Sequence, residues 1–341
     1  MAETNLQILL RRRPTGMPVA EDFEIVETAV PAPQDGEVLI RHRFLSLDPY
    51  MRGRMDDAKS YSKPVELGAV MEGRSVGEIV ASRAPGFAVG DHVMMGVGWQ
   101  RFSCVPAAGL IRVDPNEIKL SANIGVLGMP GLTAWVGLED IGTPKAGETV
   151  VVSAASGAVG QVVGQIARIK GCRVVGVAGG KAKCDFVVRE LGFDACIDHR
   201  APDLAAQVAA ACPKGVDVYW ENVGGPVQDA VWPLFNDFGR MVMCGMIAQY
   251  NTVAGVAGGA GAPPGPNLGV VVRKRLHIQG FIVSDKGWPR YPRFRVEMLG
   301  WIKSGDLRWK EDVVQGLRNA PAAFIGLLQG RNFGKLVVEI D

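Results

Sequence analysis

Residues 149–170, TVVVSAASGAVGQVVGQIARIK, decide the fold that this sequence predicts. The segment opens with a continuous apolar run, which is typical of a strand buried within a parallel sheet. A turn of small residues follows, and then a proline-free stretch in which apolar residues recur at helical spacing. We therefore expect a buried strand, a tight turn and an amphipathic helix.

The turn reads Ala154-x-x-Gly157-x-x-Gly160. A missing Cβ lets the backbone bend sharply and approach a pyrophosphate, while the helix N-terminus offers free amides and a positive dipole. The spacing is that of a dinucleotide fingerprint with alanine at its first position. Because the chain has 44 glycines, the surrounding sequence has to support this interpretation.

The strand predicted at residues 173–178 bears on the choice of nucleotide. An NAD-binding chain carries an acid about 20 residues past the turn, which binds the ribose 2′-hydroxyl. Here the strand is followed by Gly179, Gly180 and two lysines, Lys181 and Lys183, and by no acid. Lysines at a helix start oppose the helix dipole, so we expect at least one to bind the 2′-phosphate of NADP. The alternative is that both are ordinary solvated residues.

Composition narrows the class of protein. With 341 residues, 48% of them hydrophobic and 21% charged, the chain is globular and long enough for two domains. Scattered basic residues and a net charge of +2 offer no field suited to nucleic acid. No apolar run has the length of a membrane span and no signal peptide is evident, so we expect a cytoplasmic protein. Scattered cysteines and histidines predict no metal site.

The order of predicted elements indicates two architectures. Short strand-like runs from residue 5 to about 124 favour a small barrel or sandwich, and residues 121–140 are expected to form a helix, capped by Ser121, that Pro130-Gly131 breaks or restarts. After residue 149, strands alternate with helices, which predicts a doubly wound parallel sheet. A strand at 276–283 and a helix at 291–303 complete it, and the chain after residue 307 is expected to return to the first domain.

Ligands of such sheets lie outside the carboxyl ends of the strands. This rule puts Lys183, His199, residues 222–225 and residues 244–250 on a common rim. The Gly-, Ala- and Pro-rich residues 251–269 are expected to form a loop over this rim, either as a lid or as a passive linker. In the first domain, Asp48-Pro49 presents Tyr50, which either lines a substrate pocket or covers the edge of the core.

Several motifs carry a resemblance that covers the whole chain, namely LDPYMR at 47–52, GMPGLTA at 128–134, AASGAVG at 154–160, ENVGG at 221–225 and CGMI at 244–247. With them the chain resembles the zinc-independent medium-chain dehydrogenase/reductases. Among these it is most similar to the NADPH-dependent alkenal/one reductases, which include prostaglandin reductases, plant double-bond reductases and bacterial curcumin reductase. The resemblance implies an α/β fold with a GroES-like β-barrel domain, residues 1–125 with 307–341, and a Rossmann domain, residues 126–306, with a cleft between them. It also implies a homodimer.

The resemblance further implies which residues bind NADPH. Gly157 to Gly160 would hold the pyrophosphate, and Lys183, rather than Lys181, the 2′-phosphate. Relatives commonly carry a tyrosine where this chain has His199, whose imidazole can stack or hydrogen-bond near the adenosine phosphate. The full set of implied cofactor contacts is Met129, Thr133, Gly157, Ala158, Val159, Gly160, Gly179, Lys183, His199, Asn222, Cys244, Gly245, Met246, Ile247, Tyr250, Phe281, Ile282, Val283 and Asn332.

The implied reaction is the NADPH-dependent reduction of the C=C bond of an α,β-unsaturated ketone or aldehyde. Negative charge then develops on the carbonyl oxygen, and Tyr250, Tyr50 and a ribose hydroxyl are candidate donors to it. Two other classes compete with this enone or enal reductase: a non-catalytic NADPH-binding protein, whose fingerprint would look the same, and a zinc-free quinone reductase. A zinc alcohol dehydrogenase is disfavoured because residues 46–54 contain neither Cys nor His. The sequence does not distinguish one enone from another.

Overall fold

The computed structural model of the protein describes residues 3–252 and 265–341. This part of the chain forms two compact units. Unit 1 contains residues 3–125, residues 250–252 and Glu311–Asp341, and unit 2 contains residues 126–249 and 265–310. Unit 1 is therefore built from both ends of the chain, whereas unit 2 comes from its middle.

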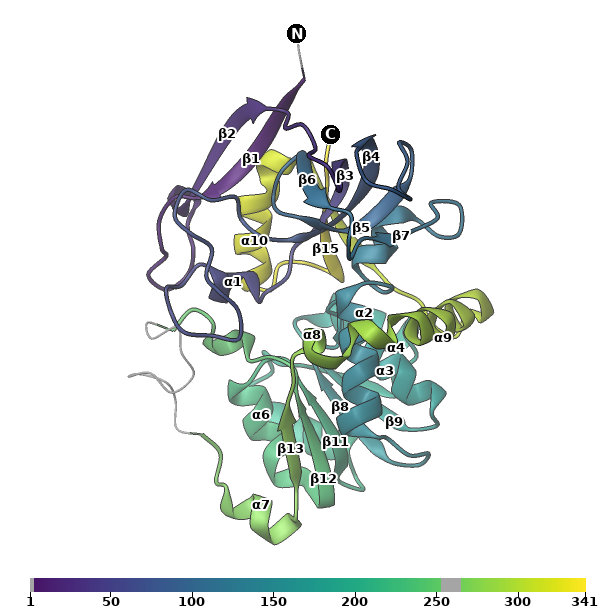
Figure 1. Ribbon diagram of the computed structural model, residues 1–341. Coiled ribbons are helices and arrows are strands. Elements are labelled where there is room, and N and C mark those ends of the chain that lie inside the picture. The colour runs from purple at the N-terminus through teal and green to yellow at the C-terminus, as the bar shows by residue number, and fades with distance from the viewer. Residues whose placement is uncertain (1–2, 253–264) are drawn as a thin grey trace. The chain divides into compact units, whose positions relative to one another are not determined.

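Unit 1 is organised around the long strand β3 (Glu37–Ser46). β4 (Arg74–Ser82) runs antiparallel along one edge of β3, while β6 (Phe102–Pro106) and β15 (Lys335–Glu339) follow each other along the other. Register shifts between β3 and β4 mark bulges, which bend the strands as the expected barrel requires. The remaining strands are β5 (His92–Val97), β7 (Ile111–Arg112) and β14 (Glu311–Gln315), and the separate antiparallel pair β1 (Thr4–Leu10) and β2 (Phe23–Ala29) (Figure 1).

The end of the chain completes this sheet. β15 pairs antiparallel with β3, with Val337 opposite Ser46, and β14 pairs parallel with β15. The chain thus returns to unit 1 from Glu311 onward. The helical segments of unit 1 are short, and they are η1 (Ala20–Asp22), α1 (Met51–Arg54), η2 (Leu120–Ile124), η7 (Leu317–Asn319) and α10 (Ala320–Leu328).

The helix expected at residues 121–140 is not a single helix. The chain forms the 3-10 turn η2, then α2 (Met129–Gly137) and the π-turn η3 (Leu138–Gly142). α2 begins next to Pro130, whose missing N–H is tolerated only in the first turn of a helix. Ser121 does not cap a helix, because its hydroxyl donates to Glu311 Oε2 at 2.7 Å.

Unit 2 contains a parallel sheet of six strands in the order β10-β9-β8-β11-β12-β13 (Figure 1). The order reverses between β8 and β11, as in the predicted doubly wound sheet. The strands are β8 (Thr149–Ser153), β9 (Arg173–Ala178), β10 (Ala195–Asp198), β11 (Val216–Glu221), β12 (Phe235–Met243) and β13 (His277–Gly280). The helical segments are α2, η3, α3 (Gly160–Ile169), α4 (Lys181–Arg189), α5 (Leu204–Ala211), α6 (Gly225–Val231), η4 (Trp232–Leu234), η5 (Ile247–Gln249), α7 (Gly269–Lys274), α8 (Val283–Lys286), η6 (Trp288–Arg290) and α9 (Tyr291–Ser304).

The two faces of this sheet are buried by different helices. On one face Val151, Val175 and Tyr219 belong to a core that includes residues of α5 and α6. On the other face Trp220 packs so closely against α2 that a Cβ on Gly137 would lie 2.5 Å from its ring. Burial on both faces explains why β8 is a continuous apolar run.

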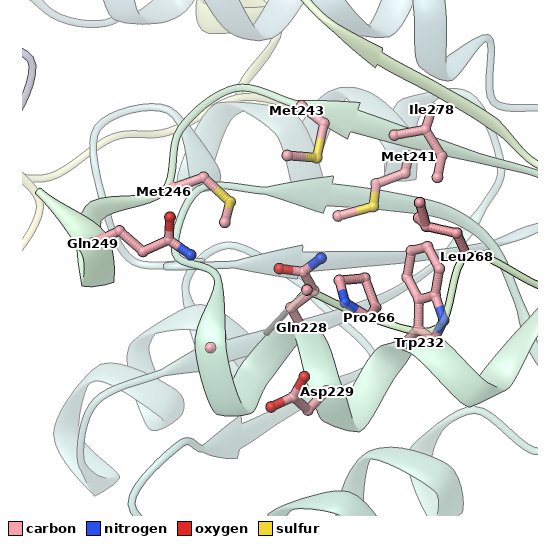
Figure 2. A pocket seen from close by; sticks show the side chains of 12 residues that line it. Gln228, Asp229, Trp232, Met241, Met243, Met246, Gln249, Pro266, Leu268 and Ile278 are labelled. Atoms are coloured by element: carbon pink, nitrogen blue, oxygen red, sulfur yellow. The ribbon is translucent and has the colours of Figure 1, made fainter. Parts of the chain in front are cut away.

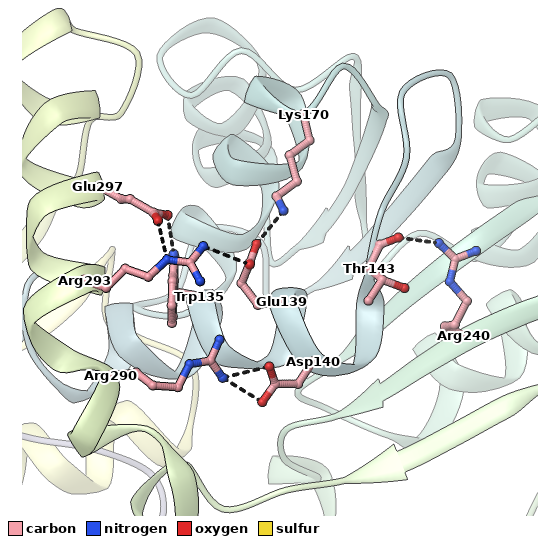
Figure 3. A network of polar contacts seen from close by, with 9 residues as sticks. All are labelled: Trp135, Glu139, Asp140, Thr143, Lys170, Arg240, Arg290, Arg293 and Glu297. Carbon is pink, nitrogen blue, oxygen red and sulfur yellow. Dashed lines mark hydrogen bonds and ion pairs between the residues drawn. The ribbon is translucent and has the colours of Figure 1, made fainter.

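A polar network holds α9 and η6 against α2 and η3 (Figure 3). Arg290 binds both carboxylate oxygens of Asp140 at 2.7 and 2.8 Å, and its guanidinium stacks 4.6 Å from the ring of Trp135. Trp135 Nε1 in turn donates to Glu297 Oε2 at 2.8 Å. The stacking of the planar guanidinium on the ring of Trp135 favours arginine over lysine at this position.

Two expectations about the end of unit 2 differ from the structure. The strand expected at 276–283 ends at Gly280, because its neighbour β12 ends at Met243, opposite Gly280, and offers no partner beyond it. Most of the loop expected at 251–269 lies outside the described residues, and Gly269 begins α7. Within residues 3–252 and 265–341, every helix is too short or too polar to cross a membrane.

Candidate functional site

The turn between β8 and α3 brings the backbone into unusually close contact. Ala154 adopts a left-handed φ of +49°, and the N–H of Gly157 donates to its carbonyl oxygen at 2.8 Å. A Cβ on Gly160 would lie 2.3 Å from this oxygen, and one on Gly157 would lie 3.1 Å from it. Only glycine fits at 160, so the turn has the shape that lets a pyrophosphate approach the start of α3.

Most of the predicted cofactor contacts follow the ends of the six parallel strands. Because the strands are parallel, these residues all lie at the carboxyl ends of the strands, which we call the carboxyl edge of the sheet. They are Gly157, Ala158, Val159 and Gly160 after β8, Gly179 and Lys183 after β9, His199 after β10, Asn222 after β11, Cys244, Gly245, Met246 and Ile247 after β12, and Phe281, Ile282 and Val283 after β13. Met129 and Thr133 lie on α2, while Tyr50, Tyr250 and Asn332 belong to unit 1.

Glu221, which the sequence analysis did not select, organises the middle of this edge. Its fully buried carboxylate accepts hydrogen bonds from Ser153 Oγ (3.0 Å), the Tyr219 hydroxyl (2.9 Å) and the N–H groups of Val223 (2.7 Å) and Gly224 (2.9 Å). Burial raises the pKa of Glu221 above the usual range. The carboxyl group thereby fixes the turn at 222–225, and the only sequence signal for it is an acid at the end of a buried strand.

Some predicted contacts already have structural roles. Asn222 Nδ2 donates to the carbonyl oxygen of Ser153 at 2.7 Å, and its Oδ1 accepts from Trp220 Nε1 at 3.1 Å. The side chain thus links β8 to β11 at the point where the strand order reverses. Phe281 packs edge-on against Trp220, with 6.0 Å between ring centroids. Contacts of Asn222 and Phe281 with a cofactor stay predictions.

Other predicted contacts also have partners within their own units. Thr133 Oγ1 donates to the carbonyl oxygen of Met129 at 2.8 Å, within α2. In unit 1, Asn332 Nδ2 donates to the carbonyl oxygen of Gly334 at 2.8 Å. Burial raises the pKa of the Cys244 thiol to about 12, so at neutral pH it is a neutral packing group and not a nucleophile.

The two lysines that the sequence proposed for a phosphate lie in the first turn of α4. Lys181 Nζ forms an ion pair with Asp185 at 2.6 Å on the same helix, and the preference for Lys183 stays a prediction. The ring of His199 lies beside Gly179, because a Cβ on Gly179 would be 2.9 Å from His199 Nε2. Arg200, which the sequence analysis did not select, lies against the same turn.

Tyr50 stands in unit 1 just before α1, among charged neighbours. The guanidinium of Arg54 lies 5.6 Å from the ring centroid of Tyr50 and 4.4 Å from that of Tyr61, and it pairs with Glu72 at 2.7 Å. Burial, and next the charge of Asp48, raise the pKa of Tyr50. The phenol therefore keeps its proton at neutral pH and can donate it to a hydrogen bond.

Two buried cations hold the segments that carry the tyrosines. Lys335 Nζ binds Asp48 Oδ1 at 3.1 Å and the carbonyl oxygen of Leu47 at 2.7 Å, which fixes the turn before Tyr50. Arg52 on α1 donates from Nε to Asn251 Oδ1 at 3.1 Å. This bond joins the residue after Tyr250 to the helix that follows Tyr50.

A pocket of about 270 Å³ opens in unit 2 between α6, β12 and β13 (Figure 2). Figure 2 shows Met241, Met243 and Ile278 on the strand side and Gln228 and Trp232 on the helix side. Met246, one of the predicted cofactor contacts, stands at its end. Flexible thioether side chains adapt to varied apolar shapes, so this hollow suits an apolar group.

The sheet order and the glycine turn define a nucleotide-binding protein of the doubly wound class. A family model described as N-terminal domain of oxidoreductase matches residues 6–113, and one described as zinc-binding dehydrogenase matches residues 158–300. Although that description names zinc, the described residues contain no group of three or more His, Cys, Asp or Glu side chains that could hold a metal ion.

Individual relatives align along nearly the whole chain. The NADPH-dependent curcumin reductase of Escherichia coli is 47% identical, over 99% of this chain and 97% of its own. The NADP-dependent 2-alkenal reductase of Nicotiana tabacum is 40% identical, over 100% and 99%. The crystal structure of CurA from Vibrio vulnificus in complex with NADPH superimposes with a TM-score of 0.92 at 47% identity, covering 98% of this chain and 99% of that one. The chain therefore belongs to the medium-chain dehydrogenase/reductase family, in the group of these reductases, and the resemblance found in its motifs is confirmed.

Proposed function

We propose that the protein reduces the C=C bond of α,β-unsaturated ketones and aldehydes with NADPH as its cofactor. The observation that carries this proposal is the combination of the glycine turn with a basic, acid-free end of β9, in a chain 47% identical to an NADPH-dependent curcumin reductase. The alternatives of a non-catalytic NADPH-binding protein and a zinc-free quinone reductase have no structural observation in their favour, and more distant quinone oxidoreductase structures share the fold alone.

The residues of the glycine turn fit a dinucleotide. The space next to Gly160 admits no side chain, a Cβ on Gly157 would be tight, and the turn leads into the ten-residue helix α3. We assign the pyrophosphate to Gly157 through Gly160 and the 2′-phosphate to Lys183, and we assign the other predicted contacts to the rest of the same cofactor. Bound NADPH would supply the hydride that adds to the β-carbon of the substrate, and a proton from solvent would complete the reduction at the α-carbon.

The tyrosine hydroxyls are suited to donate hydrogen bonds to the negative charge that develops on the substrate oxygen. When the β-carbon is reduced, negative charge develops on the carbonyl oxygen, and a donor that meets this charge lowers the barrier. Tyr50 keeps its proton, and the stacked Arg54 restrains its ring. We propose Tyr250 and Tyr50 as the donors. An isolated alkene lacks the conjugated oxygen and is expected to be inert.

The test is to incubate the protein with NADPH and an aryl enone and to identify the product by mass spectrometry and NMR. We expect the saturated ketone, because conjugation allows hydride to add at the β-carbon. An allylic alcohol would contradict the assignment. Tight binding of NADPH without its oxidation by several enones and enals would instead favour the binding-protein alternative.

Single substitutions assign the donor. Tyr250→Phe or Tyr50→Phe should lower kcat by about 10²-fold if the missing hydroxyl served the developing charge. Tyr61→Phe is the matched control, because Tyr61 is exposed and its ring, which stacks on Arg54, is retained. An unchanged rate in both test variants would move the role to a ribose hydroxyl or to water.

We also propose that the protein is a homodimer in the cytoplasm. β13 is the edge strand of the six-stranded sheet, and all of its residues are exposed. An open edge is a template for pairing with a second copy, and exposed Val272 and Leu268 lie near it in the chain. All six cysteines are free thiols, which suits a reducing compartment.

A further inference from the structure

Two cysteines of unit 2 face each other between α4 and β10. Cys184 and Val187 are the buried residues of α4, and they lie on one face of the helix because they are three positions apart. A Cβ on Gly176, in β9, would lie 3.0 Å from Val187 Cγ1. The face of α4 that carries Cys184 therefore packs on the sheet at Gly176.

Cys196 faces the same interface from β10. It pairs with Gly176 in the parallel register of β9 and β10, and paired residues of neighbouring strands point to the same face of a sheet. The next residue, Ile197, belongs to the core on the opposite face. The side chain of Cys196 thus points toward α4, where its thiol forms a hydrogen bond with the thiol of Cys184.

The pair lies at the margin of the sheet. β10 is an edge strand of the six-stranded sheet, and Cys196 is only partly buried. Cys184 is 9% exposed. A molecule as small as a peroxide can therefore reach the two sulfurs from solvent.

The two thiols differ in how readily they lose a proton. The hydrogen bond from Cys196 lowers the pKa of Cys184, although burial and the charge of Asp198 oppose it. The same hydrogen bond, and next burial, raise the pKa of Cys196. Cys184 also lies in the first turn of α4, where the helix dipole favours a thiolate. The pKa values of the remaining thiols are raised by burial, and these are Cys104, Cys172, Cys212 and Cys244.

We propose that Cys184 and Cys196 form a redox site that a hydroperoxide converts reversibly into a disulfide. The Cys184 thiolate attacks the outer oxygen of the peroxide, the O–O bond breaks, and an alcohol or water leaves with a proton from solvent. Cys184 is then a sulfenic acid. The sulfur of Cys196 attacks that of Cys184, the S–O bond breaks, and the hydroxide leaves as water with the proton of Cys196.

The reaction is balanced and can be reversed. Two electrons pass from the two sulfurs to the peroxide, and a dithiol reductant returns them by thiol–disulfide exchange. In a reducing compartment such a disulfide is transient, which is typical of redox-sensing sites.

The disulfide would act on the start of α4, and this step rests on the proposed use of NADPH. Cys184 directly follows Lys183, to which we assign the 2′-phosphate. A disulfide holds two sulfurs closer together than a hydrogen bond does, so it draws the start of α4 toward β10. Oxidation therefore displaces Lys183 and lowers the affinity for NADPH.

The first experiment looks for the disulfide in the whole protein. After treatment with hydrogen peroxide, free thiols are blocked with N-ethylmaleimide and the protein is digested with trypsin without reductant. Trypsin cuts after Lys183, Arg189 and Arg200, so the disulfide is seen by mass spectrometry as peptide 184–189 linked to peptide 190–200. We expect this linked peptide, and dithiothreitol should split it. Peroxide-treated protein in which both thiols are still blocked by N-ethylmaleimide would overturn the proposal.

Serine variants assign the two roles. Cys196→Ser should lose the linked peptide and accumulate a sulfenic acid at Cys184 that dimedone labels, because the second thiol is absent. Cys104→Ser is the matched control: it makes the same change at another partly buried thiol, in unit 1, and should form the linked peptide as the parent does. Dimedone labelling of Cys196 in Cys184→Ser, with none on Cys184 in Cys196→Ser, would contradict the assigned roles.

The second experiment measures NADPH affinity by cofactor fluorescence before and after peroxide treatment. The oxidised parent should bind NADPH about tenfold more weakly, because a charge-assisted contact is weakened, and dithiothreitol should restore the affinity. Peroxide-treated Cys196→Ser should keep the affinity of its untreated form. If the linked peptide forms while the affinity is unchanged, the effect on the cofactor is wrong. If the reduced parent binds no NADPH, the proposed function fails, whereas the linked peptide still decides whether the redox site exists.

Discussion

Ala154 holds a position at which nucleotide-binding turns usually carry glycine. Its φ of +49° is a left-handed conformation that costs an alanine about 1 kcal/mol relative to glycine. Gly160, six residues on, has the opposite constraint, since a Cβ there would lie 2.3 Å from the carbonyl oxygen of Ala154. The backbone conformation at Ala154 would therefore suit glycine better, whereas Gly160 cannot be replaced by a larger residue without a shift of the turn.

Two substitutions test this contrast. Ala154→Gly should raise the thermal midpoint of unfolding by a few degrees, because roughly 1 kcal/mol corresponds to 2–4 °C in a chain of this size. Gly160→Ala should lower it, because the backbone of the turn must shift at a cost of about 1–3 kcal/mol. Differential scanning calorimetry of the free protein measures both. A midpoint of Gly160→Ala equal to that of the parent would contradict the close contact.

For single residues, the sequence predicted which residue types would form the nucleotide site but not which groups they contact. The glycine spacing and the missing acid were readable because they are local patterns. The preference for Lys183 over Lys181 came from the family resemblance and stays a prediction. The only local signal of Glu221 is an acid at the end of a buried strand, because its importance comes from groups that the fold brings near.

His42 joins three strands of unit 1. From β3 its Nδ1 meets Ser75 Oγ on β4 at 2.7 Å, and its Nε2 meets Ser103 Oγ on β6 at 2.8 Å. The ring is fully buried, and burial lowers its pKa to about 4. A neutral imidazole can donate to one serine and accept from the other, so the link is complete only in the neutral form.

Acid should therefore weaken unit 1 through this residue. The unfolded chain protonates His42 near pH 6.5 and the folded chain only near pH 4, so the unfolded state binds more protons between these values. The contribution is constant above pH 6.5 and is lost as the pH falls toward 4. Between pH 7 and pH 5 the loss is about 2 kcal/mol.

Thermal unfolding of the parent and of His42→Gln across this range isolates the effect, since both chains share every carboxylate. We expect the parent to lose more stability than the variant on acidification. Parallel pH profiles for the two chains would show that His42 does not titrate as the structure indicates.

The ends of helices and strands were predicted best where the local sequence alone determines them. β9 matches its predicted range, residues 173–178, because the buried run ends at the turn residues Gly179 and Gly180. The helix expected at 121–140 and the strand expected at 276–283 were too long. Their true ends depend on the close approach of Ser121 to Glu311 and on where β12 stops, and neither is visible in local sequence.

For the whole molecule, the open edge of β13 carries the prediction of a dimer. In a two-fold pairing of this strand with a second copy, Ile278 would lie near its own equivalent or its neighbours. Ile278→Lys should then place like charges close together and yield monomers. Val296→Lys on α9 adds the same charge at another exposed position of unit 2 and should leave the assembly intact.

Light scattering after size-exclusion chromatography measures the molecular mass of the assembly in solution. The parent should have twice the chain mass of 36.4 kDa, and Ile278→Lys the mass of one chain. If the parent is monomeric at all concentrations tested, the proposed homodimer is wrong.

The doubly wound fold and the return of the chain to the first domain were predicted from the order of the elements, whereas the bounds of the two domains came from the resemblance. Composition and periodicity contain no sign that β15 pairs with β3, because the two strands are separated by the whole of unit 2.

That pairing has a consequence for the protein during its synthesis. Every strand of the unit 2 sheet precedes β14, so this sheet can form while the last segment of the chain is still inside the ribosome. β3 leaves the ribosome early and lacks its β15 neighbour until residue 335 and beyond are made. At 5–20 residues per second, roughly 15–60 s separate the two strands. During this interval the nascent chain exposes an unpaired stretch of β3, to which a chaperone could bind.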